Sequence, residues 1–124
     1  MTDLDHGTAA ELGELRAAIA STMVGLMKQF YGKGPTKAKT YIADEYLFVV
    51  MDGGLTRNEE TLLAAGEDML VRQVRLRFQE AVREQVTSAI EALVGKKVVT
   101  YHSQIVFDPP RTFEVFVLEA PLGS

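Results

Sequence analysis

The longest helical pattern in this sequence spans residues 68–94, and its length limits the folds that the chain can adopt. Apolar residues return at every third or fourth position and predict one buried stripe, made of Val71, Val74, Phe78, Val82, Val86, Ile90 and Leu93. We expect Asp68 to cap the beginning of this helix and Gly95 to end it.

The predicted helix is long compared with the whole chain. At 1.5 Å per residue it would extend about 40 Å, whereas 124 residues have an expected radius of gyration of about 14 Å. Either the helix kinks or its far end packs on a second copy of the chain. We therefore predict a homodimer, since two-fold dimers are the commonest symmetric assemblies.

A second long helix is predicted over residues 9–31. Thr8 and Glu11 form a capping box at its beginning, and Gly32 with Gly34-Pro35 ends it. Residues 38–51 are rich in β-branched and aromatic side chains and predict a hairpin of two short strands. A second capping box, from Thr56 and Glu59, opens a short helix that reaches about residue 65.

The chain closes with two predicted strands over residues 98–107 and 112–119, joined by a turn at residues 108–111. In the first strand, Val99, Tyr101, Ile105 and Phe107 are expected to share one face. The second is apolar on both faces, and such strands are usually covered on both. The order α-β-β-α-α-β-β predicts an α+β domain, an antiparallel four-stranded sheet packed against helices. We expect a flexible N-terminus over residues 1–8, one domain over residues 9–120 and a tail over residues 121–124.

Composition excludes several kinds of chemistry. The sequence has no cysteine, so it forms no disulfide, thiolate metal site or thiol nucleophile. No apolar run approaches the roughly 20 residues that a membrane-spanning helix needs. The first residues are acidic instead of basic, and we expect no signal peptide.

Basic residues gather in one part of an acidic chain. Residues 15–43 contain five bases and no acid, although the net charge of the chain is −4. Such a cluster can attract anions or an acidic partner, or can simply be a solvated surface. The candidate partner or anion surface consists of Lys33, Gly34, Pro35, Lys37 and Lys39. Nucleic-acid binding is the less favoured use, because the isoelectric point is near 5.2.

No group of residues matches a known catalytic or metal-binding pattern. His6 lies near the chain end, and His102 would need a carboxylate such as Glu114 or Glu119 to orient its ring. The paired acids at residues 44–45 and 59–60 are typical of turns and helix beginnings. The glycines at residues 32 and 34 lack the spacing and context of a phosphate-binding loop. We expect no catalytic residues, no cofactor and no metal.

Several landmarks together resemble a known family. Residues 30–35, read Phe-Tyr-Gly-Lys-Gly-Pro, and Tyr41-Ile42 resemble the FxGKGP opening of a small bacterial domain family. Residues 54–59 with Leu62-Leu63 resemble its LTxxExxL segment, and residues 71–86 and 96–99 fit its later landmarks. The sequence is therefore similar to the MpsC-like family, and the resemblance covers residues 12–119.

The resemblance implies a biological setting and no catalytic residue. It associates the chain with a Na⁺-translocating, membrane-potential-generating system, as an accessory or regulatory subunit. Related operons pair a membrane subunit with a soluble one in inorganic-carbon uptake. The implied location is cytoplasmic, peripheral to the inner face of the membrane, with a membrane-transport subunit as partner.

Two functional hypotheses of different classes follow. The first is a non-enzymatic interaction module that binds a subunit of a membrane system through the candidate lysine surface. The alternative is a dimeric small-ligand-sensing domain, with a pocket between sheet and helices gated by Tyr41, Tyr46 or Tyr101.

Overall fold

Two antiparallel hairpins join into one four-stranded sheet in the computed structural model, which describes residues 8–122. The elements follow the predicted order, and the α+β class is confirmed. In chain order they are α1 (Ala9–Tyr31), β1 (Lys37–Ala43), β2 (Tyr46–Asp52), α2 (Arg57–Ala64), α3 (Asp68–Val94), β3 (Val98–Phe107) and β4 (Pro110–Leu118). His6 lies outside the described residues.

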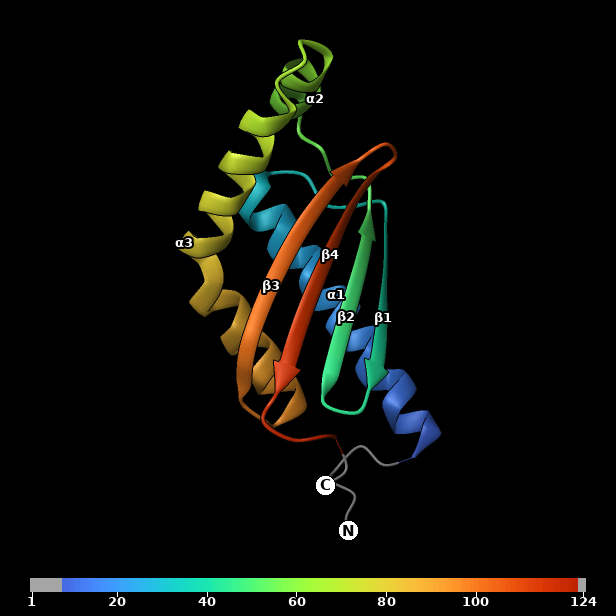
Figure 1. The fold of residues 1–124 in the computed structure, drawn as a ribbon. Helices are drawn as coiled ribbons and strands as arrows, with labels where there is room; N and C mark the ends of the chain where they lie inside the picture. Colours follow the sequence, from blue (N-terminus) through green and yellow to red (C-terminus); the bar gives the residue numbers. More distant parts are fainter. Residues whose placement is uncertain (1–7, 123–124) are drawn as a thin grey trace.

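The strand order β1-β2-β4-β3 puts the two hairpins side by side through their second strands. β2 and β4 are therefore central, and β1 and β3 form the edges. Helices α1 and α3 lie behind one face of this sheet, while α2 and the first turns of α3 extend beyond its end (Figure 1). The predicted length of this helix is thus confirmed: α3 has 27 residues and is longer than the sheet it packs against.

The helix ends follow mostly from local sequence. Both predicted capping boxes form, at Thr8 with Glu11 and at Thr56 with Glu59. Gly32 and Gly95 adopt the left-handed conformation that ends α1 and α3. The expected Asp68 cap is wrong: Glu67 holds the N-cap position of α3, without a side-chain cap hydrogen bond, and Asp68 is the first helical residue.

The core lies between the sheet and the two long helices. Its fully buried centre consists of Ile19, Met23, Leu47, Val49, Val86, Ile90 and Phe116. Phe116 stands on central strand β4 and stacks against Tyr101 of β3, with ring centroids 4.8 Å apart. These contacts fix the two hairpins to each other and to the helices, so β4 is the centre of the fold.

The outer face of the sheet stays open in residues 8–122, contrary to the expectation that β4 is covered on both sides. The cause is the placement of both long helices on the other face. Four aromatic residues on this outer face keep 38–46% of their surface exposed: Tyr41, Tyr46, Phe48 and Phe113. We call the face that carries them the outer sheet face.

Two sequence-based burial predictions are wrong in detail. Val74 and Phe78 of the predicted stripe are each 40% exposed, because they face the end of α1 and helix α2 and not the sheet, and Gln79 is buried instead. Val99 is 61% exposed, since a β-bulge between Val98 and Thr100 turns it away from the Tyr101 face. The predicted turn is also shorter, because β4 begins at Pro110.

We expect Phe116→Ala to lower the free energy of unfolding by about 3–5 kcal/mol, the usual cost of removing a large buried aromatic side chain. Urea unfolding at constant pH measures this change. Val99→Ala, at an exposed position of the neighbouring strand, is the matched control and should change stability by less than about 0.5 kcal/mol. Equal losses for both variants would contradict the assigned core.

Candidate functional site

Helix α3 lies along the open edge of strand β3 and supplies hydrogen-bond partners to its backbone. Arg72 Nη1 donates to the carbonyl oxygen of Ile105 at 2.8 Å. The Gln79 amide, oriented to satisfy both groups, donates to the Ser103 carbonyl at 3.0 Å and accepts from its N–H at 3.3 Å. These side chains replace the neighbouring strand that β3 lacks on this side.

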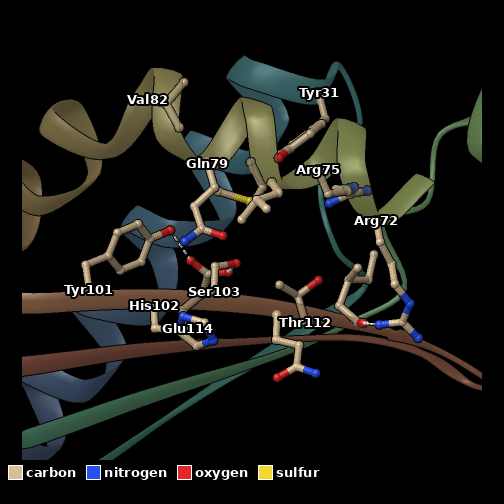
Figure 2. A pocket seen from close by; sticks show the side chains of 14 residues that line it. Tyr31, Arg72, Arg75, Gln79, Val82, Tyr101, His102, Ser103, Thr112 and Glu114 are labelled. Atoms are coloured by element: carbon tan, nitrogen blue, oxygen red, sulfur yellow. Dashed lines mark hydrogen bonds between the residues drawn. The ribbon is translucent and has the colours of Figure 1, made fainter. Parts of the chain in front are cut away.

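A cavity of about 350 Å³ lies between this part of α3 and the sheet. Figure 2 shows helix side chains on one side of it and strand side chains on the other. Its apolar lining comes from Met27, Leu76, Val82 and Ile105. Its polar lining includes Tyr31, Arg72, Arg75, Gln79, Tyr101, Ser103, Thr112 and Glu114. We call it the Glu114 cavity.

Glu114 is the buried acidic group of this cavity, and only 1% of its surface is exposed. It stands on the inner face of β4, directly opposite Ser103 of β3 in the strand register. The Ser103 hydroxyl donates to Glu114 Oε2 at 2.5 Å, and the Tyr101 hydroxyl donates to Oε1. Two neutral hydroxyl groups thus hold the carboxylate in place.

Burial controls the titration of this cluster. Removal from water raises the pKa of Glu114 to about 7, while the hydrogen bonds from Ser103 and Tyr101 act in the opposite direction. Burial, followed by the nearby Glu114 charge, raises the pKa of Tyr101 above its usual value, so its hydroxyl remains a donor. The raised pKa of Glu114 places its change of charge near neutral pH.

Arg75 closes one end of the cavity and ties α2 to α3. Its Nε donates to Glu59 Oε2 at 2.5 Å and its Nη2 to Oε1 at 2.6 Å. Its guanidinium also lies 4.1 Å from the Tyr31 ring centroid. Burial opposes ionisation of Glu59, but the hydrogen bonds from Arg75 and Thr56 hold the pKa of Glu59 below its usual value. The Glu59 carboxylate therefore already neutralises the Arg75 charge.

The candidate lysine surface lies apart from this cavity. Lys33, Gly34 and Pro35 lie in the loop between α1 and β1. Lys37 and Lys39 alternate on the exposed side of edge strand β1, and the Lys39 ammonium lies 5.1 Å from the Tyr41 ring centroid. The geometry therefore groups the two strand lysines with an aromatic side chain, and their role stays a prediction.

The suggested partners of His102 are engaged elsewhere. His102 is exposed and lies opposite Val115 in the strand register. Glu114 accepts from Tyr101 and Ser103 instead, while a carboxylate oxygen of Glu119 accepts from the Lys97 N–H at 2.9 Å. Within residues 8–122, no group of three or more histidine or acidic side chains is arranged to hold a metal ion.

The sensing hypothesis placed a pocket between the sheet and the helices, and such a pocket is present. Only one of the three tyrosines that were expected to gate it lines this pocket. Tyr101 lines the Glu114 cavity, whereas Tyr41 and Tyr46 lie on the outer sheet face. Arg72 and Gln79 point toward β3 (Figure 2). Arg75 points toward Glu59 of α2, and no sequence pattern singled out these three side chains. The available signal was Glu114 itself, an acid in alternation with Phe116 and Leu118 on the buried side of a strand.

Comparison with known proteins places the chain in a family. Residues 11–120 match the family described as the Na⁺-translocating membrane potential-generating system (MpsC). The chain belongs to the MpsC family. The Glu114 cavity and the candidate lysine surface both lie within the matched region. The resemblance inferred from the sequence landmarks is thus confirmed.

A relative from Bacillus subtilis (strain 168), described as the uncharacterized protein YbcI, is 27% identical over 94 residues. The alignment covers 75% of this chain and 76% of that protein. No solved structure matches the chain. Across residues 8–122, none of the helices combines the length and apolar character needed to cross a bilayer.

We expect Glu114 to make stability fall as the pH rises. Its pKa is raised from an ordinary 4.5 to about 7, so the folded chain binds an extra proton between these pH values, and the stabilisation is complete below pH 4.5. That contribution, about 3 kcal/mol, should be lost as the pH rises through 7. Urea unfolding of the wild type and Glu114→Gln between pH 5 and 8.5 measures it.

Glu114→Gln should remove this pH-dependent part, so the difference between the two proteins should change between pH 5 and about pH 7 and then level off. Glu84→Gln, at an exposed helix position, is the matched control and should follow the wild type. A constant difference between wild type and Glu114→Gln would mean that Glu114 titrates normally in the folded chain.

Proposed function

We propose that this chain is a non-catalytic accessory or regulatory module of an ion- or bicarbonate-translocating membrane system. The observation that carries the proposal is the MpsC family match, which spans nearly the whole chain. In this proposal the chain works in the cytoplasm, peripheral to the inner face of the membrane. It binds a membrane-transport subunit and performs no chemistry itself.

The partner surface in this proposal is the lysine cluster. Charge supports this choice, because Lys33, Lys37 and Lys39 belong to the sequence stretch 15–43, which contains no acidic residue although the chain is acidic overall. Two of them stand on an edge strand beside Tyr41, which adds apolar contact area. Such a surface suits an acidic, partly apolar segment of a partner protein.

We expect the Lys33→Glu/Lys37→Glu variant to lose its membrane partner in a pull-down from detergent-solubilised membranes of the host, read by mass spectrometry. Charge reversal at exposed positions should leave the melting temperature nearly unchanged. Lys96→Glu/Lys97→Glu, which reverses the same charge elsewhere, is the matched control. Full recovery of the partner with the Lys33/Lys37 variant would remove this surface from the proposal.

We also propose that the module is a homodimer, with the exposed beginning of α3 packed on a second copy. Four apolar side chains support this region as an interface: Met69, Leu70, Val74 and Leu76 are 40–73% exposed. Light scattering should give twice the chain mass of 13.7 kDa at micromolar concentration. Leu70→Lys should give the single-chain mass, whereas Phe48→Lys on the outer sheet face should not. A monomeric wild type would contradict the dimer.

The Glu114 cavity favours a second candidate function, small-ligand sensing. Its volume of about 350 Å³ falls in the range of small-molecule sites, and a few polar groups converge in a largely apolar lining. Because it lies between α3 and the sheet, a bound ligand would change how firmly the helix is held. A sensor of this kind can act within the same accessory module.

The sensing proposal predicts stabilisation by its ligand. A ligand at 100 times its dissociation constant adds about 2.7 kcal/mol to the free energy of unfolding, and the melting temperature should rise accordingly. Thermal shift across bicarbonate, nucleotides and common metabolites measures this effect, with Val82→Trp, which fills the cavity, as the control. A flat response of the wild type across the collection would count against sensing.

A further inference from the structure

We propose that the Glu114 cavity binds a small organic cation, an amidinium, guanidinium or alkylammonium group on a short apolar or aromatic body, whose charge pairs with Glu114. This inference rests on the sensing proposal and specifies its ligand class. It follows from three features of the cavity: a buried carboxylate whose oxygens accept from neutral hydroxyls, apolar walls, and arginines that already have partners.

The first feature is the charge of Glu114. The side chain is 99% buried, and its two oxygens accept from the neutral hydroxyls of Tyr101 and Ser103. A buried carboxylate is stable as an ion only when a cation compensates it, and otherwise it takes up a proton. The site is therefore built to exchange a proton for another positive charge.

The two arginines of the cavity are committed to other groups. Arg75 makes a two-pronged ion pair with Glu59, and both side chains are only about one-tenth exposed, at 11% and 10%. Arg72 donates to the Ile105 carbonyl and lies 4.7 Å from the Phe107 ring centroid. An anionic ligand at Arg75 would have to displace the Glu59 carboxylate and would also face the Glu114 charge, which disfavours anions at this end of the cavity.

The size and the lining of the Glu114 cavity favour an organic cation over a metal ion. The cavity of about 350 Å³ is many times the roughly 30 Å³ share of one water molecule. Met27, Leu76, Val82 and Ile105 cover much of its wall, and the only metal ligand among them is the Met27 thioether, which suits soft ions alone. They suit a hydrocarbon or aromatic body, with the Thr112 hydroxyl and the Gln79 amide near the polar end.

Cation binding to Glu114 should also depend on pH, because the cation competes with a proton. The titratable or charged groups that line the cavity besides Glu114 are Tyr31 from α1, Arg72 and Arg75 from α3, and Tyr101 and His102 from β3. Burial raises the pKa values of both tyrosines. With Glu114 near pKa 7, cation affinity should rise about tenfold between pH 6 and pH 8.

Calorimetric titration with benzamidine tests the proposal, with neutral benzamide and anionic benzoate as probes of the same shape. We expect benzamidine to bind the wild type with about tenfold higher affinity at pH 8 than at pH 6, and to bind at least tenfold tighter than benzamide or benzoate at pH 8. Glu114→Gln should lose this preference, while Glu84→Gln should bind as the wild type does. Val82→Trp, which blocks the cavity, is the second variant in case Glu114→Gln does not fold.

Several results would overturn the inference. Preferred binding of benzoate or benzamide would reject the cation and leave small-ligand sensing in place. Benzamidine binding that is unchanged in Glu114→Gln or Val82→Trp would locate the cation elsewhere. No binding of any probe would reject the cation class, while the metabolite screen and the membrane pull-down would still decide sensing and the accessory role separately.

Discussion

The contact between α3 and the open edge of β3 determines the rest of this structure. A sheet edge has unpaired N–H and C=O groups, and here Arg72 and Gln79 supply partners to Ile105 and Ser103. Long polar side chains hold the helix against the strand by their ends, so space remains behind them. The Glu114 cavity is that space, and a helix packed through short apolar side chains would have closed it.

The buried carboxylate is the costly part of this arrangement. An apolar residue at position 114 would continue the inner face that Phe116 and Leu118 begin, and would satisfy the core without a hydrogen-bond network. Instead the chain places three polar groups between the sheet and the helices: Tyr101, Ser103 and Glu114. Polar groups that reduce stability while converging on a cavity are typical of functional sites.

The fold followed from the sequence because its signals are local. Capping boxes at Thr8 and Thr56 and the glycines that end both long helices act through adjacent residues, so the element order and these helix ends were predictable, whereas the beginning of α3, which has no side-chain cap, was not. The cavity depends on which face of α3 meets which strand, and Arg72, Arg75 and Gln79 fit an exposed helix face equally well in sequence. The bulge beside Val99 likewise depends on pairing with β4. The cavity and the bulge therefore depend on contacts between distant segments of the chain, which the periodicity of the sequence does not specify.

Glu114 lies in a cavity between the sheet and α3, and its raised pKa means that it should gain or lose its proton near neutral pH. The most direct test is carbon-13 NMR of the side-chain carboxyl groups in glutamate-labelled protein, titrated from pH 4 to pH 9, with the Glu114 signal assigned through Glu114→Gln. We expect a midpoint near pH 7 for that signal. A midpoint near the ordinary 4.5 would mean that the carboxylate is hydrated or paired with a cation in the free protein, and would contradict the account.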